Sequence, residues 1–213
     1  MKLAVFFAGD RSIEKEAEKM GINTFSIDYK DYENIDLVKD VEYVTIKDIP
    51  FIPDVVWGSP DCTTYSIAAC STHRIDSITP KSEYAEKCDR VNYHFLELIR
   101  EWLLINPSMK YFIENPRGMM RKMPFMQGIP RATVTYCQYG DDRMKPTDIW
   151  SNHIYSLFRQ DGWMPRPICK NGDTCHVSAP RGAKTGTQGR KGSYERSKIP
   201  AELCREILDS CRK

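Results

Sequence analysis

The sequence predicts an α/β protein built on a doubly wound, mostly parallel sheet. Short apolar runs typical of buried strands alternate with segments of helical spacing, and this alternation favours a parallel sheet. Three of the apolar runs are followed closely by polar or reactive side chains, at Cys62, Glu114 and Gln138. Ligands bind at the carboxyl ends of the strands in such sheets, so the same pattern locates a candidate site.

The elements follow from local patterns. The first helix is expected to begin at Ser12, a good N-cap, and to stop at Gly21. A second helix covers 84–105, where apolar residues recur on one face, and Pro200 opens the last one. Apolar runs predict strands at residues 3–8, 23–27, 41–46, 54–57, 110–113 and 132–137.

Size and composition indicate one compact domain with a small appendage. The chain has 213 residues, of which 41% are hydrophobic, and a formal net charge of +2. No apolar run approaches the roughly 18 residues of a membrane span, and the first nine residues are too short for a signal peptide. Eight cysteines are scattered without a secretion signal, so reduced thiols are expected. We therefore expect a cytoplasmic protein, and we expect it to be a monomer.

Two long segments lack periodicity and are predicted to be irregular. Residues 68–82 form a polar loop, and 152–192 are rich in glycine, proline and polar residues. The expected organisation is a core over 1–151, a small insertion over 152–192 and a C-terminal helical region over 193–213. Basic residues exceed acidic ones between 170 and 198, which suits a phosphate backbone but equally suits a solvated loop.

The loop after the strand at 54–57 carries the most informative residue, Cys62. Pro60 stiffens this loop, and hydroxyl side chains follow the thiol. The alternative is a buried structural cysteine, among the commonest fates of this residue type. Glu114, which follows the strand at 110–113, favours a reactive thiol instead, although Glu114 could also cap a helix.

In this order the motifs resemble the cytosine-C5 DNA methyltransferases. Phe7-Ala8-Gly9 is similar to that family's cofactor loop, Pro60 with Cys62 to its nucleophile loop, and Glu114-Asn115 to its Glu-Asn-Val motif. Gln138 with Arg143 resembles the Gln-x-Arg-x-Arg motif, and Ser197-Lys198-Ile199-Pro200 the C-terminal motif that folds back to the cofactor. Three departures stand out: Asp10-Arg11-Ser12 replaces further glycines, Asp61 replaces a second proline, and the spacing from Gln138 to Arg143 differs.

The resemblance implies a reaction that suits these residue types. A thiolate at Cys62 would add to C6 of cytosine and so make C5 nucleophilic. Glu114 would protonate N3 if burial raises its pKa. Arg143 is the expected donor to O2, but an ion pair with Asp141 or Asp142 is an equal alternative. Asp61, beside the nucleophile, should disfavour the thiolate unless it points away or pairs with Arg11.

The implied cofactor is S-adenosyl-L-methionine. Phe7, Gly9, Pro60 and Ser197 are expected to surround it, and Asp28 is placed to bind ribose hydroxyls. Asp40 resembles the family's adenine-contacting position, although a solvated loop aspartate is as plausible a reading. Cys169, Cys175 and His176, with His153 as a possible fourth ligand, raise the question of zinc. They lack a Cys-x-x-Cys pair, so no metal is expected.

The expected partner is duplex DNA with a flipped cytosine, because a stacked base hides C6. Base and phosphate contacts are predicted for Arg74 and, within the short insertion, for Arg181, Lys184, Gln188 and Arg190. The small size suits a phage genome, where such an enzyme shields DNA in restriction-modification. Two alternatives stay open: a DNA-binding module of the same fold with little or no activity, and an RNA cytosine-5 methyltransferase.

Overall fold

The computed structural model describes residues 1–170, 172–177 and 192–212. Within these residues a single sheet has the strand order β3-β2-β1-β4-β5-β7-β6. The first five strands are parallel neighbours, whereas β7 is antiparallel to both β5 and β6. The predicted doubly wound, mostly parallel sheet is confirmed. The strands are β1 (Lys2–Phe6), β2 (Asn23–Asp28), β3 (Leu37–Val38), β4 (Val55–Gly58), β5 (Lys110–Pro116), β6 (Arg131–Thr135) and β7 (Pro146–Ser151).

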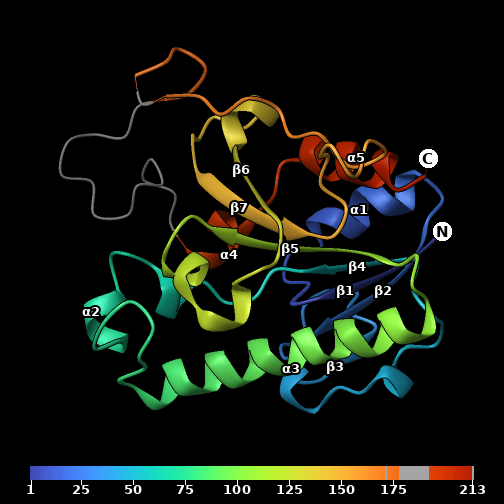
Figure 1. Cartoon of the computed structure of the whole chain (residues 1–213), viewed down its shortest axis with the longest axis horizontal. Coiled ribbons are helices and arrows are strands. Elements are labelled where there is room, and N and C mark those ends of the chain that lie inside the picture. The colour runs from blue at the N-terminus through green and yellow to red at the C-terminus, as the bar shows by residue number, and fades with distance from the viewer. Residues whose placement is uncertain (171, 178–191, 213) are drawn as a thin grey trace.

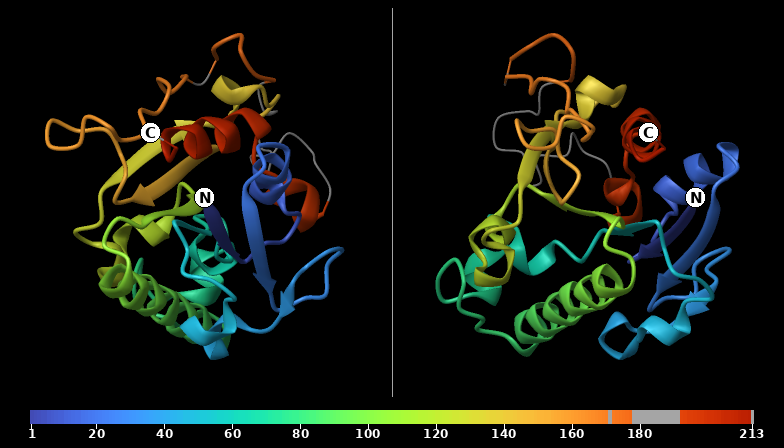
Figure 2. Two further views of the ribbon diagram at one scale, coloured as in Figure 1. Left: turned by 90° about the vertical axis from the view of Figure 1, so that its right-hand side faces the viewer. Right: turned by 45° about the vertical axis from the view of Figure 1, so that its right-hand side comes forward.

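Helices cover both faces of the sheet (Figure 1). The long helix α3 (Glu83–Ile105) lies on one face, and α1 (Ser12–Lys19) and α5 (Ala201–Ser210) lie side by side on the other (Figure 2). Two short helices, α2 (Cys70–His73) and α4 (Ser193–Ser197), lie towards the carboxyl ends of the parallel strands.

The alternating side chains of β1 show why the sheet is covered twice. Ala4 and Phe6 belong to the core beneath α3, whereas Leu3 and Val5 belong to the core beneath α1 and α5. Successive residues of a strand point to opposite faces, so a strand that is apolar at every position must be buried on both.

One predicted strand was wrong, and two strands, β3 and β7, were not predicted. Residues 41–46 do not form a strand but begin two short 3₁₀ turns, Val41–Tyr43 and Ile46–Asp48. Asp40 caps the first turn by accepting from the Glu42 N–H. Val41 and Val44, three positions apart, are both buried in the core beneath α3, and this spacing suits a turn better than a strand. Strand β7 was missed because it begins at a proline and pairs antiparallel between β5 and β6.

The C-terminal region packs against the loop between β1 and α1. Leu203 and Ile207 of α5 share a core with Ile13 and Ala17 of α1. The backbone N–H of Ile199 donates to the Ser12 hydroxyl at 3.0 Å. The loop between β1 and α1 is therefore covered by residues nearly two hundred positions away.

The first part of the 152–192 segment belongs to the core. Trp163 is buried against the α5 face of the sheet and donates through its ring nitrogen to Glu206. Arg166 stacks on Tyr139 and pairs with Glu202 and Glu206 of α5. This part of the chain is fixed to the domain and does not form a separate unit.

Among the described residues, none of the helices combines the length and the apolar character that crossing a membrane requires.

Glu14 of α1 carries a buried carboxyl group, and we predict that replacing it stabilises the protein. Its side chain is fully buried, and neither oxygen has a hydrogen-bond partner among the described residues. Burial raises its pKa from 4.5 to about 8. A raised pKa makes the protonated form favourable to folding, and this contribution is lost as the pH rises from 4.5 through 8. Glu14→Gln should therefore raise the free energy of unfolding by on the order of a few kcal/mol at pH 8, and by little at pH 4.5.

Urea denaturation of both proteins across this pH range measures the difference. Glu101→Gln, at an exposed position of α3, is the matched control and should change stability little at any pH. A Glu14→Gln gain that does not grow with pH would contradict the assignment.

Candidate functional site

The site lies where two adjacent parallel strands end. Gly58, the last residue of β4, is paired with Ile113 of β5, so the loop after β4 and the residue Glu114 come together. Cys62 follows β4 by four positions, and Glu114 and Asn115 are the fifth and sixth residues of β5. The sheet register itself therefore brings the two sequence motifs side by side.

The Cys62 loop is held from two sides. The Asn115 amide donates to the Pro60 carbonyl at 2.8 Å, which ties the loop to β5. After β5, Gly118 approaches the loop so closely that a Cβ there would lie 2.5 Å from the Tyr65 carbonyl oxygen. Only glycine fits this approach, and the thiol is carried on a loop of fixed shape.

Cys62 is accessible to solvent, but the charges around it disfavour ionisation of its thiol. The residue is exposed overall, yet its thiol lies close to protein atoms and to the carboxylates of Asp61 and Glu114. Desolvation and these carboxylates raise the pKa of the thiol to about 11, while Lys145 and a backbone hydrogen bond act in the opposite direction. The thiol is therefore almost entirely protonated at pH 8.

Asp61 is not paired with Arg11. One oxygen accepts from the Thr63 backbone and the other from the Tyr84 hydroxyl, at 2.6 and 2.5 Å. Neither partner neutralises its charge, so the carboxylate still opposes ionisation of Cys62. This agrees with the sequence argument that Asp61 disfavours the thiolate.

Glu114 is a fully buried acid with specific partners. The Tyr136 hydroxyl donates to it at 2.8 Å, and Ser59 also hydrogen bonds to it. Burial raises its pKa, while Lys145 and these hydrogen bonds act against the increase. A raised pKa is the condition under which Glu114 can act as a proton donor.

Lys145 is a site residue that the sequence analysis missed. Its ammonium group is buried, lies 4.5 Å from the centre of the Tyr136 ring, and donates to the Arg196 carbonyl. Burial lowers its pKa, and the charges of Glu114 and Cys62 oppose that change. The only sequence signal was a second basic residue two positions after Arg143.

Arg143 forms the ion pair with Asp141 that the sequence analysis gave as an alternative to substrate binding. Its guanidinium is fully buried and pairs with Asp141, and it also donates to the carbonyls of Arg196 and Lys198 at 3.1 Å each. These contacts tie the segment before α5 to the β6–β7 connection. We expected Arg143 to donate a hydrogen bond to the substrate. The structure corrects this, because the guanidinium group is buried and donates to Asp141 and to two backbone carbonyls.

Gln138 makes no described contact with Cys62. It belongs to the 3₁₀ turn η6 (Tyr136–Tyr139) that follows β6, and its amide donates to the Cys175 sulfur at 3.5 Å. Its backbone carbonyl accepts from Arg166. Its described contacts are therefore with a cysteine-rich cluster and not with the proposed nucleophile.

Arg74 was expected to contact DNA, and the structure corrects this. The residue is 2% exposed, pairs with Asp89, and lies 4.5 Å from the centre of the Tyr65 ring. It also donates to the Thr64 carbonyl, so it supports the far end of the Cys62 loop. The other predicted DNA contacts, Arg181, Lys184, Gln188 and Arg190, lie outside the described residues.

The β1–α1 loop has a conformation suited to a ligand. Phe7, Gly9 and Arg11 all adopt left-handed backbone angles, with φ of 57°, 53° and 58°. Strained positions of this kind cluster at functional sites. The Gly9 N–H donates at 3.0 Å to Asp28, whose carboxyl is buried at the end of β2, and burial raises its pKa.

Two further expected cofactor residues have local structural partners. Asp40 caps the turn at Val41 through the Glu42 N–H and pairs with Lys87 of α3 at 2.6 Å. The Ser197 hydroxyl donates to the Tyr194 carbonyl. Asp40 is thus engaged in holding its loop on α3.

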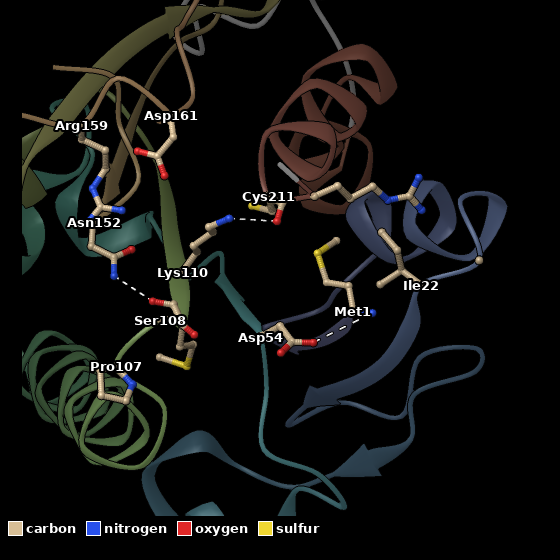
Figure 3. Close-up of a pocket in the computed structure, with 13 residues that line it drawn as sticks. Met1, Ile22, Asp54, Pro107, Ser108, Lys110, Asn152, Arg159, Asp161 and Cys211 are labelled. Carbon is tan, nitrogen blue, oxygen red and sulfur yellow. Dashed lines mark hydrogen bonds and ion pairs between the residues drawn. The ribbon is translucent and has the colours of Figure 1, made fainter.

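A pocket of about 650 Å³ lies at the opposite edge of the sheet (Figure 3). It is lined by residues at the amino ends of the strands, including Met1, Asp54 and Lys110. Parallel sheets bind ligands at the other edge, so this pocket is not the site described above.

Comparisons with known proteins identify the fold. No protein-family model matches the sequence, and a search of curated proteins finds no match. Solved structures do match: a putative DNA modification methyltransferase encoded within an E. coli prophage has a TM-score of 0.53 at 12% identity, covering 79% of this chain and 52% of that one. The Entamoeba histolytica methyltransferase EhMeth has a TM-score of 0.52 at 17% identity, covering 71% of this chain and 52% of that one. This chain spans about half the length of these structures, and it has the Rossmann-like fold of S-adenosylmethionine-dependent methyltransferases.

Proposed function

We propose that the chain methylates C5 of cytosine in duplex DNA, with Cys62 as the nucleophile and S-adenosyl-L-methionine as the donor. The observation that carries the proposal is the position of Glu114, a fully buried acid with a raised pKa at the end of the strand to which the Cys62 loop is tied. A thiol and a protonated carboxylic acid at adjacent strand ends are the two groups that addition to C6 requires.

The residues of the β1–α1 loop fit the donor. Asp28 offers a buried carboxylate to ribose hydroxyls, and the left-handed turn through Gly9 lets backbone approach a ligand. When bound, S-adenosylmethionine supplies an electrophilic methyl group. Phe7, Gly9 and Asp28 are the residues that we propose hold it.

The protein groups then act in a fixed order. Cys62 gives its proton to solvent and its sulfur bonds to C6, while Glu114 gives a proton to N3 and so prevents negative charge on the ring. C5 then takes the methyl group, and a neutral thioether is left. Water or hydroxide removes the C5 proton, the electron pair restores the C5–C6 double bond, and the C6–sulfur bond breaks. N3 returns its proton to Glu114 and the thiolate is protonated again by solvent, so the enzyme is regenerated.

Lys145 replaces Arg143 as the cation of this scheme. It is the group that lowers the pKa of Cys62 and offsets the burial of Glu114. The side-chain amide oxygen of Asn115 (Oδ1) is buried without a hydrogen-bond partner among the described residues, so it is an acceptor available to a bound base.

The test is methyl transfer from tritiated S-adenosylmethionine to duplex DNA of mixed sequence and, in parallel, to structured RNA. The expected result is labelled DNA that yields 5-methylcytosine on digestion. Labelled RNA with unlabelled DNA would overturn the DNA assignment and favour the RNA alternative. No label in either, with the protein folded and DNA still bound, would favour the inactive binding module.

A further inference from the structure

Three cysteines and a histidine that the proposed reaction does not use come together beside β6. Cys137 lies in η6, whereas Cys169, Cys175 and His176 come from the segment after β7. One potential ligand atom from each of the four lies within 4.8 Å of every other. Residues more than thirty positions apart in sequence thus converge at one point of the fold.

Three of the four separations below fit one tetrahedral ion, and the sulfurs of Cys137 and Cys169 would move apart by about 0.7 Å to bind it. Sulfur to sulfur, Cys137 is 3.1 Å from Cys169 and 3.7 Å from Cys175. The His176 Nδ1 atom is 3.7 Å from the Cys169 sulfur and 3.5 Å from that of Cys175. Zinc–sulfur bonds of about 2.3 Å at tetrahedral angles place two sulfurs about 3.8 Å apart, and zinc–nitrogen bonds of about 2.0 Å place nitrogen and sulfur about 3.5 Å apart.

The surroundings of the cluster also suit a metal. Gln138 donates to the Cys175 sulfur, which is the kind of hydrogen bond that supports a thiolate ligand. The Cys169 backbone donates to the Thr135 hydroxyl, and the Val177 backbone donates to the Asp142 carbonyl. Both ends of the ligand segment are therefore held against the β6 region independently of the thiols.

We propose that Cys137, Cys169, Cys175 and His176 bind a structural zinc ion. Three thiolates and one imidazole fill a tetrahedral shell, and a filled shell is typical of structural sites and not of catalytic ones. The sequence expectation of no metal rested on the missing Cys-x-x-Cys pair and on His153 as the fourth ligand. His153 instead bonds to the Ser210 carbonyl, and Cys137 takes the fourth place.

The site would fasten the chain next to a predicted DNA-contacting stretch. His176 and Val177 directly precede residues 178–191, which include Arg181 and Lys184. A zinc ion would fix the start of that stretch to η6, close to the end of β6. This inference concerns metal binding and is independent of whether the protein methylates cytosine.

The test measures metal in the full-length, untagged protein, purified with reductant and without chelator. Elemental analysis by mass spectrometry should find about one zinc per chain. Cys175→Ser and His176→Ala should each lose most of it, whereas His176→Cys should retain it because a fourth thiolate can replace imidazole. Cys70→Ser, at a thiol outside the cluster, is the matched control and should keep full occupancy.

A second measurement guards against variants that fail to fold. Wild-type protein stripped of metal and supplied with Co²⁺ should develop sulfur-to-cobalt charge-transfer bands and the visible bands of a tetrahedral ion. Folded protein that carries no zinc and takes up no cobalt would overturn the proposal. So would a Cys137–Cys169 disulfide, found by mass spectrometry after alkylation of free thiols in freshly lysed cells.

Discussion

Cys62→Ser is expected to abolish methyl transfer, with a loss of about 10³-fold or more. A serine hydroxyl has nearly the same size but ionises far less readily than a thiol, and it adds poorly to a pyrimidine ring. The measurement is the rate of label transfer from tritiated S-adenosylmethionine to duplex DNA. Because Cys62 is exposed and its thiol supports no described packing core, the variant should fold normally.

DNA containing 5-fluorocytosine separates a nucleophile from a merely nearby thiol. Release of Cys62 requires removal of a proton from C5, and fluorine at C5 cannot be removed in this way. The protein should therefore stay bonded to C6 and migrate as a protein–DNA adduct in denaturing gels. Wild-type protein and Cys70→Ser, altered at a half-exposed thiol of the same region, should form the adduct. An adduct that survives in Cys62→Ser would remove Cys62 from its assigned role.

Glu114→Gln is expected to slow methyl transfer by about 10²–10⁴-fold. Glutamine keeps the shape and can still accept from the Tyr136 hydroxyl, but it has no proton to give to N3. The wild-type rate should rise with pH as Cys62 ionises and level off above the raised pKa of Glu114, because the proton donor is then lost while the thiolate still increases. The rate of the variant should continue to rise with pH, which a purely structural role of Glu114 would not predict.

Stability separates the two roles further. Glu114 is buried, so its charge opposes folding, and Glu114→Gln should be no less stable than wild type at pH 8. Glu101→Gln, at an exposed site on α3, should keep the wild-type rate. A Glu114→Gln variant that transfers methyl groups at more than about half the wild-type rate would contradict the assignment of Glu114 as the acid.

The sequence by itself determined the sheet and indicated the edge at which the candidate site lies. Alternating apolar runs and helical segments indicated a doubly wound sheet, and residues after those runs indicated the edge at which Cys62 and Glu114 meet. This succeeded because parallel neighbours bring their carboxyl ends to the same edge. Strand β7 was beyond such reasoning, since an antiparallel strand inserted between two others follows from pairing partners distant in sequence.

Only the tertiary structure decided which charged side chains are free to act. Arg74 and Arg143 are basic residues in polar segments, and sequence patterns cannot distinguish an open cation from one whose donors are used by Asp89 or Asp141. Lys145 became a site residue because the fold buries it near Glu114 and Cys62. The cluster of Cys137 with Cys169, Cys175 and His176 likewise depends on η6 meeting a distant segment. In each case the role of the side chain depends on which residues bury it. Those residues are distant in sequence, so sequence order alone does not identify them.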